Sequence, residues 1–71
     1  MAVRWEVDVA ALQRAQVLRG WTQRDLARAA VVDCDTVSDL YRARRRPTLR
    51  TILALCRVLD LEMDQVIRFL D

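Results

Sequence analysis

The chain has 71 residues, of which 54% are hydrophobic and 31% are charged, and its formal net charge is +2. This length is enough for one small domain, and no apolar run reaches the ~18 residues of a membrane span. Two cysteines are too few for a disulfide framework, and the lack of any His or C-x-x-C pair argues against a zinc site. Because the sequence has no signal peptide, we expect a cytoplasmic protein with reduced thiols.

Residues 1–7 read as an extended or strand-like N-terminal arm. In the sequence MAVRWEV, hydrophobic residues alternate with Arg4 and Glu6, which is the period of a short strand. No other segment reads as a strand, so two interpretations stay open. The arm tucks Trp5 onto the rest of the molecule, or it pairs with the strand of a second subunit. We expect a single domain over residues 8–71.

A first helix is predicted from about Val9 to Arg19. Asp8 stands at the position of a capping residue, whose side chain accepts a hydrogen bond from the first helical turn. Gly20 is the expected stop, because glycine adopts the left-handed conformation that ends many helices.

The stretch from Gly20 to Leu40 predicts two short helices with a tight turn between them. Thr22 and Asp25 have the spacing of a capping box at the start of the first. Asp33 is the candidate cap of the second. Ala27 is small enough to let the two helices cross closely. A short helix, a tight turn and a second helix form a helix-turn-helix.

Two further helices complete the expected fold. Pro47 ends the helix before it, and Thr48 caps a fourth helix. The apolar stripe of the fourth helix is predicted to be Leu49, Ile52, Leu53, Cys56 and Leu59. A fifth helix is expected to carry Met63, Val66, Ile67 and Leu70. The sequence therefore predicts an all-α, compact five-helix bundle with a short arm.

At these positions the chain resembles the helix-turn-helix of the phage repressor and Cro family, also called the Xre family. Members typically read G-L-T-Q-x-x-L-A and then G-V-S-x-x-T-I-S-x-I, and this chain is in step at Gly20, Thr22, Gln23, Leu26, Ala27, Val32, Thr36, Val37, Ser38 and Leu40. Downstream, the family pattern also matches Arg45, Pro47, Thr48, Leu49, Thr51, Leu55, Leu59 and Asp64. The resemblance covers about residues 12–68. It implies a repressor or Cro-type transcriptional regulator that binds a palindromic operator in double-stranded DNA as a homodimer.

The second helix of the motif is the recognition helix that the resemblance implies. Its base-reading positions fall on Cys34, Asp35, Ser38 and Asp39. Relatives commonly carry Gln, Arg, Asn or Lys there, so the carboxylates are a departure. A carboxylate can accept a hydrogen bond from cytosine N4, but it also repels phosphates. Two interpretations remain: the helix reads bases, or it has lost DNA binding and docks a protein.

Phosphate contacts are expected at the start of the motif and after the recognition helix. Gln23 matches a family glutamine that bonds a phosphate beside a helix N-terminus. The run from Arg42 to Arg50 holds five arginines, and all twelve basic residues of the chain are Arg. Arginine suits phosphate, although a GC-rich genome produces the same bias. The candidate phosphate-binding residues are Thr22, Gln23, Thr36, Tyr41, Arg42, Arg44, Arg45, Arg46 and Thr48.

Two further departures from the family affect its geometry. Val31 stands where the turn usually has glycine, and a β-branched residue disfavours positive φ. We therefore expect a different turn geometry. Many relatives pair an Arg on the first helix with a Glu on the recognition helix. The matching residues here are Gln16 and Tyr41, which can make only a neutral contact.

The high hydrophobic content predicts an apolar surface patch and hence a partner. For a homodimer, we expect the patch to include Trp5, Val66, Phe69 and Leu70, with the last three on or beside the outer face of the final helix. The alternative is a protein-interaction module on the same fold, such as an anti-repressor. No cofactor and no membrane contact is expected, and a DNA-binding protein would associate with the nucleoid.

No catalytic constellation stands out in the sequence. The chain has no His, no glycine-rich phosphate loop, and no Ser or Cys nucleophile with a base at hand. We therefore do not expect an enzyme. From this length we also expect no separate sensor domain.

Overall fold

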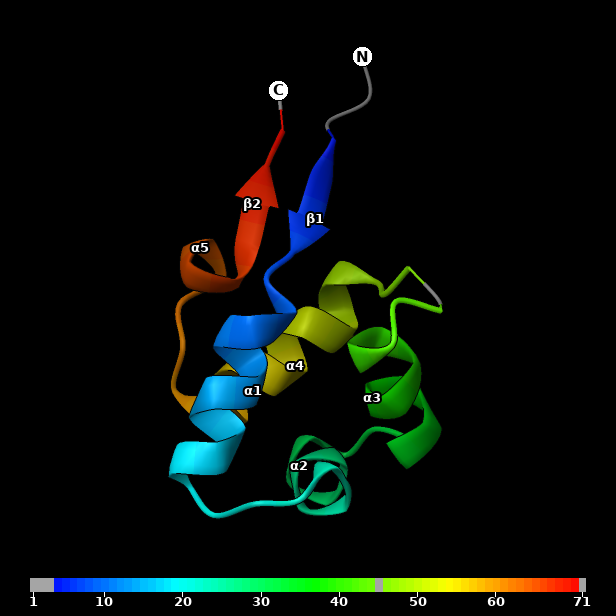
Figure 1. Ribbon diagram of the computed structural model, residues 1–71, viewed down its shortest axis with the longest axis vertical. Coiled ribbons are helices and arrows are strands. Elements are labelled where there is room, and N and C mark those ends of the chain that lie inside the picture. The colour runs from blue at the N-terminus through cyan, green and yellow to red at the C-terminus, as the bar shows by residue number, and fades with distance from the viewer. Residues whose placement is uncertain (1–3, 45, 71) are drawn as a thin grey trace.

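Five helices and two short strands make up the described chain, which comprises residues 4–44 and 46–70 of a computed structural model. The elements are β1 (Trp5–Val7), α1 (Val9–Leu18), α2 (Gln23–Ala30), α3 (Cys34–Tyr41), α4 (Leu49–Leu59), α5 (Met63–Val66) and β2 (Ile67–Phe69). Figure 1 shows the helices gathered at one end of the molecule and the two strands extending from the other. The predicted five-helix fold is confirmed.

The N-terminal strand pairs with the C-terminal segment of its own chain. β1 and β2 are antiparallel, and Trp5 lies opposite Phe69. The predicted strand is therefore present and pairs within its own chain, and Trp5 packs against the core, as the first of the two interpretations expects. The fifth helix is correspondingly shorter than predicted, because it ends at Val66 and neither Ile67 nor Leu70 is helical.

The helices begin at the residues whose side chains cap them. Asp8 accepts a hydrogen bond of 3.2 Å from the Ala11 N–H, and Thr48 caps α4 in the same way. At the start of α2, Thr22 and Asp25 each accept a hydrogen bond from the backbone N–H of the other, at 3.1 and 2.9 Å. These three predictions are confirmed. At α3 the predicted position is also confirmed, because Asp33 is the N-cap residue, but its side chain makes no capping hydrogen bond.

The turn between α2 and α3 keeps a left-handed residue although it contains no glycine. Val31 has φ 58° and ψ 46°, and the Val32 N–H donates a 2.9 Å hydrogen bond to the Ala27 carbonyl. The prediction of a different turn geometry is therefore wrong. The closing hydrogen bond and the packing of Val32 hold the turn in place. Gly20, with φ 71°, ends α1 as predicted.

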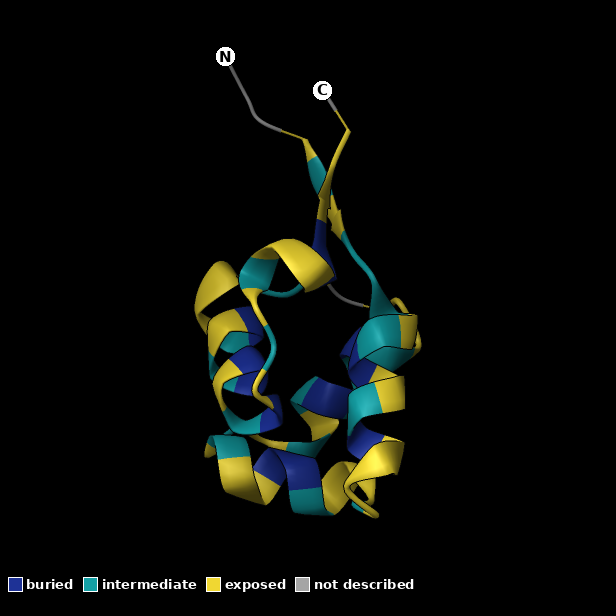
Figure 2. Ribbon diagram, turned by 90° about the vertical axis from the view of Figure 1, so that its left-hand side faces the viewer, coloured by how far each residue is buried: buried dark blue, intermediate teal, exposed yellow. Residues whose placement is uncertain are grey.

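One core joins the helices and the inner end of the two strands (Figure 2). On α4 the buried residues include Leu55, which the predicted stripe omitted, while Leu49 and Leu53 are 50% and 38% exposed. Ala27 is 3% exposed where α2 packs on α3, as its small size requires. No helix of the described chain is long and apolar enough to cross a membrane. The buried hydrophobic residues are Leu12, Leu26, Ala27, Val37, Leu40, Ile52, Leu55, Cys56, Leu59, Val66 and Ile67.

Candidate nucleic-acid interface

Three of the candidate base-reading residues of the recognition helix α3, Asp35, Ser38 and Asp39, lie outside the hydrophobic core, whereas Cys34 packs against it. Val37 and Leu40 are buried, and they fix the orientation of the helix. Asp35 is exposed, whereas Cys34, Ser38 and Asp39 are half-buried. Residues 34, 35, 38 and 39 lie on one face because helical neighbours recur every three to four positions. Asp35 is the most accessible of the four carboxylate, thiol and hydroxyl groups.

Three arginines follow the recognition helix without an acidic partner. Arg42, Arg44 and Arg46 are exposed, and none forms an ion pair with another residue of the part of the chain that the structure describes. The fourth candidate, Arg45, lies outside the described residues. Unpaired guanidinium groups favour binding of an external anion, since no local carboxylate neutralises them. Their placement next to α3 fits the predicted phosphate contacts.

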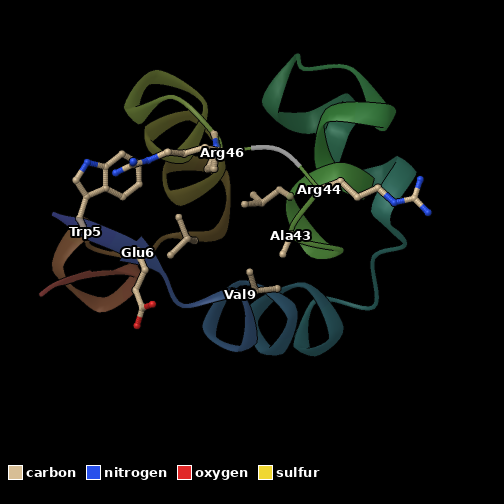
Figure 3. A pocket seen from close by; sticks show the side chains of 9 residues that line it. Trp5, Glu6, Val9, Ala43, Arg44 and Arg46 are labelled. Atoms are coloured by element: carbon tan, nitrogen blue, oxygen red, sulfur yellow. The ribbon is translucent and has the colours of Figure 1, made fainter.

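The loop after α3 sets the direction of these arginines. Ala43 has φ 56°, and the Arg44 N–H donates a 2.9 Å hydrogen bond to the Asp39 carbonyl, which closes the end of the helix. Figure 3 shows the two arginine side chains diverging from this loop. Arg44 extends away from the strands, while Arg46 reaches Trp5, with its guanidinium carbon 4.9 Å from the ring centroid.

The contact between Trp5 and Arg46 has no counterpart among the sequence-based expectations. Trp5, which is predicted to belong to a dimer interface, lies half-buried against the core with a guanidinium over its ring. A cation–π contact of this kind restricts the arginine and adds a modest attraction. No sequence signal links residues so far apart along the chain.

At the start of α2, Gln23 is exposed and occupies the first helical position. The hydroxyl of Thr22 accepts the N–H of Asp25, and the Asp25 carboxylate accepts the N–H of Thr22. The hydrogen bonds from Thr22 lower the pKa of Asp25, so this carboxyl stays ionised. Because the capping box already uses these groups, the Gln23 amide is the better candidate for a phosphate contact than Thr22.

A neutral pair replaces the ion pair of many relatives. The Tyr41 hydroxyl donates a 2.7 Å hydrogen bond to Gln16 Oε1, and Gln16 Nε2 donates to the Trp21 carbonyl at 3.1 Å. Burial raises the pKa of Tyr41 to about 12. Because the Tyr41 hydroxyl already donates its proton to Gln16, we no longer consider Tyr41 a candidate for phosphate binding.

Two threonines remain from the predicted phosphate set. The Thr48 hydroxyl accepts the N–H of Thr51 and donates to the Thr51 hydroxyl at 3.1 Å, so its main role is to cap α4. Thr36 is half-buried in α3. Neither has a geometry that singles it out as an anion contact.

Of the residues predicted for the dimer patch, one is buried in the core and two are exposed. Val66 is 0% exposed and belongs to the core, so its placement on an outer face is wrong. Phe69 and Leu70 are 63% and 48% exposed at the outer end of the two strands. Trp5 lies directly opposite Phe69 in the ladder, which puts both side chains on the same face of the sheet.

The helices α2 and α3 and the tight turn between them form a helix-turn-helix, the motif of a class of DNA-binding proteins. The chain belongs to the helix-turn-helix domain family, whose sequence model matches residues 9–69. No curated protein matches the chain. The crystal structure of the transcriptional regulator VanUg (Form II) is similar, with 21% sequence identity and a TM-score of 0.67 over 99% of this chain and 89% of that one. This likeness shows the shared fold.

Proposed function

We propose that the chain is a sequence-specific transcriptional regulator of the repressor and Cro type, in the Xre family, which binds a palindromic operator as a homodimer. The observation that carries the proposal is the row of exposed arginines, Arg42, Arg44 and Arg46, which follow the outward-facing recognition helix and pair with no carboxylate of the described chain. This arrangement supplies a sequence-independent attraction to phosphates next to a helix that fits the major groove. A protein with this function would act at the nucleoid.

In the proposed complex, α3 lies in the major groove, and Asp35 is the base-reading candidate that is most exposed to the DNA. A carboxylate there accepts a hydrogen bond from cytosine N4 and penalises bases that offer only acceptors. Gln23 would bond a phosphate at the start of α2, and the arginines would bond phosphates on the other side of α3. The carboxylates thus lower the general affinity for DNA and sharpen the choice of sequence.

The proposed homodimer forms through the two strands. Their apolar face carries Val7 and Ile67 against the core at its inner end and the exposed Phe69 at its outer end. A two-stranded sheet is marginal alone, and joining a second copy would cover both this face and an open edge. A two-fold axis there would present two recognition helices, which a palindromic operator requires.

Selection of binding sites from a random DNA pool tests the proposal. The recovered sites are expected to share a palindromic motif, and a labelled copy should bind with an affinity that falls steeply as salt rises. The control is the same protein with a scrambled duplex, which should bind far more weakly. Recovery of unrelated sequences with no affinity above the scrambled duplex would contradict the proposal.

The acidic recognition helix supports a second candidate, a protein-interaction module. Asp35 is exposed in the first turn of α3, where it repels the phosphates that the arginines attract. A basic protein surface would instead be attracted to it. If site selection fails and Asp35→Asn abolishes binding to a basic protein partner, this second function replaces the first.

A further inference from the structure

A surface cavity of about 410 Å³ lies between the N-terminal strand and the loop after the recognition helix. Its walls come from four parts of the chain, which are β1, the start of α1, the end of α3 and the residues that connect α3 to α4 (Figure 3). This volume is within the range of small-molecule sites, about 300–1,000 Å³. A second hollow, by α1 and the turn before α5, is smaller at about 260 Å³.

The lining of the cavity is mostly apolar. Val7 comes from β1, Val9 from the first turn of α1, and Leu40 from the end of α3, while Ala43 and Pro47 lie on the connecting loop. Small-molecule sites typically have such a wall with a few polar groups that orient the ligand. The wall therefore favours a ligand with an apolar body over a sugar or a bare phosphate.

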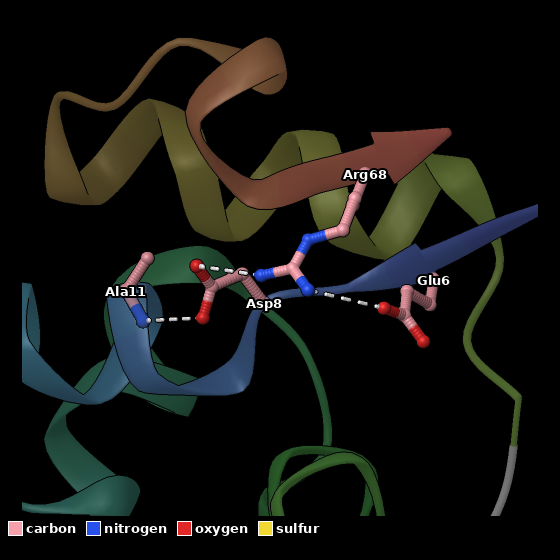
Figure 4. Close-up of polar contacts among 4 residues, drawn as sticks. All are labelled: Glu6, Asp8, Ala11 and Arg68. Carbon is pink, nitrogen blue, oxygen red and sulfur yellow. Dashed lines mark hydrogen bonds and ion pairs between the residues drawn. The ribbon is translucent and has the colours of Figure 1, made fainter. Parts of the chain in front are cut away.

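The charged groups at the cavity favour an anion. Arg46 lies over the Trp5 ring, and no carboxylate of the described residues pairs with it. The acidic residue of the lining, Glu6, is bonded across the strands to Arg68 at 3.5 Å, and Figure 4 shows that Arg68 also reaches toward Asp8. Because Arg68 offsets Glu6, the local charge that a ligand meets is positive.

We propose that this cavity binds a small organic anion with an apolar body, such as a medium-chain carboxylate. Its hydrocarbon part packs against Val7, Val9 and Pro47, and its carboxylate pairs with Arg46. A guanidinium forms two parallel hydrogen bonds with a carboxylate, which fixes the orientation of the ligand. Trp5 covers the site on the side of the strands.

The position of the site couples it to DNA binding. Arg46 is both the proposed anchor of the ligand and a proposed phosphate contact, so the ligand and the operator compete for one guanidinium. A bound carboxylate also adds a negative charge beside the DNA-facing loop. The ligand is therefore expected to weaken operator binding, and the operator to weaken ligand binding by the same factor. This coupling rests on the proposed function, whereas ligand binding does not.

Fluorescence of Trp5 provides a direct test of the site. The chain has two tryptophans, so Trp21→Phe leaves Trp5 as the reporter next to Arg46. Decanoate, kept below its micelle concentration, is expected to change the emission saturably. Decanol shares the apolar body and acetate shares the carboxylate, and each should bind at least tenfold more weakly.

Matched variants separate the roles of charge and cavity. In the Trp21→Phe background, Arg46→Gln should weaken decanoate at least tenfold, to the level of decanol, while Arg46→Lys keeps part of the affinity. Val9→Phe fills the hollow without changing any charge and should abolish saturation. Arg14→Gln, which removes an exposed arginine of α1, should change nothing. Circular dichroism of each variant confirms that it is folded.

Several results would overturn the proposal. Equal affinity for decanoate and decanol would show simple apolar adsorption, and unchanged affinity in Arg46→Gln or Val9→Phe would place the ligand elsewhere. The coupling is measured separately, by titrating decanoate into the protein–operator complex. If the protein binds no operator at all, the proposed function fails, but the fluorescence titration still decides whether the cavity is a ligand site.

Discussion

The hydroxyl of Tyr41 donates a 2.7 Å hydrogen bond to Oε1 of Gln16, a residue that is only 8% exposed. The same amide donates through Nε2 to the Trp21 carbonyl. Gln16 therefore ties α1 both to the entry of the helix-turn-helix and to the last turn of the recognition helix. A neutral pair of this kind avoids the desolvation cost that a buried ion pair would carry.

The first prediction concerns the stability that this pair provides. Tyr41→Phe leaves Gln16 Oε1 in a poorly hydrated site without its donor, which should lower the free energy of unfolding by about 1–3 kcal/mol. Urea unfolding followed by circular dichroism measures the change. Operator affinity should fall as well, because the hydrogen bond that helps to set the orientation of α3 is absent.

A double-mutant cycle checks that the effect belongs to the pair. Gln16→Met removes the acceptor and keeps a side chain of similar length, so Tyr41→Phe in that background should cost ~1 kcal/mol less than in the wild type. If Tyr41→Phe costs the same in both backgrounds, the hydrogen bond contributes nothing and the destabilisation is a packing effect.

The second prediction is a loss of stability in alkali. Burial raises the pKa of Tyr41 from 10.0 to about 12, so the unfolded chain releases this proton at a lower pH than the folded chain does. The stability that Tyr41 contributes is therefore intact below pH 10 and should be lost as the pH rises from 10 toward 12. Tyr41 is the sole tyrosine, so tyrosinate absorbance reports it directly. Tyr41→Phe should show a flatter stability profile in this window, and a titration midpoint near 10 in the folded protein would contradict the prediction.

The third prediction concerns the left-handed residue of the turn. Val31 has φ 58° and is 89% exposed, so Val31→Gly relieves an unfavourable backbone conformation and removes little packing. We expect stabilisation of about 1 kcal/mol, since the strain relieved exceeds the entropy that glycine adds to the unfolded chain. Val17→Gly is the matched control, because Val17 is also exposed but helical, and it should destabilise. Destabilisation by Val31→Gly would show that the turn carries no strain.

The local signals of the sequence are the ones that predict the structure well. The caps at Asp8, Thr22 and Thr48 depend on atoms three residues apart, and the Gly20 stop depends on one backbone conformation. The match of Gln16 with Tyr41 comes from the resemblance to a family. The family resemblance therefore predicts a contact between α1 and α3 that no local sequence pattern could predict.

Long-range pairing explains most of what the sequence does not reveal. Residues 67–69, Ile-Arg-Phe, are too few for their pattern to distinguish a helix from a strand, and only the partner β1, some 62 residues away, decides between them. The same pairing moves Val66 into the core and leaves Phe69 outside. The Trp5–Arg46 contact, and with it the cavity, depends on this arrangement.

The fourth prediction tests the proposed phosphate binding. Replacing Arg42, Arg44 and Arg46 by Ala should weaken binding to every DNA sequence, and the slope of log affinity against log salt should become shallower by about 0.9 for each phosphate that is no longer neutralised. Arg14→Ala removes an equal charge from α1 and serves as the single-site control. An unchanged slope in the triple variant would mean that these arginines belong to a solvated face.

The fifth prediction concerns the dimer, and it depends on the outer end of the two strands. Phe69 and Leu70 are 63% and 48% exposed, and the ladder continues there through the Leu70 N–H, which donates to the Arg4 carbonyl at 2.9 Å. The side chain of Phe69 therefore sits on an ordered backbone with Trp5 opposite it. A self-complementary contact about a two-fold axis needs such a fixed apolar group.

Phe69→Glu places a carboxylate at the centre of this proposed contact, and two copies of the variant would bring like charges together in an apolar interface. Sedimentation over a concentration series should show the wild type as a dimer and Phe69→Glu as a monomer, with the helical signal unchanged because the side chain lies outside the core. The monomer should also bind a palindromic operator more weakly, since each copy then binds one half-site without the aid of the other. Leu18→Glu makes the same charge change at a residue of α1 that is 80% exposed, and it should leave the dimer intact. A wild type that sediments as a monomer at all concentrations and binds DNA one copy per site would rule out the two-fold arrangement.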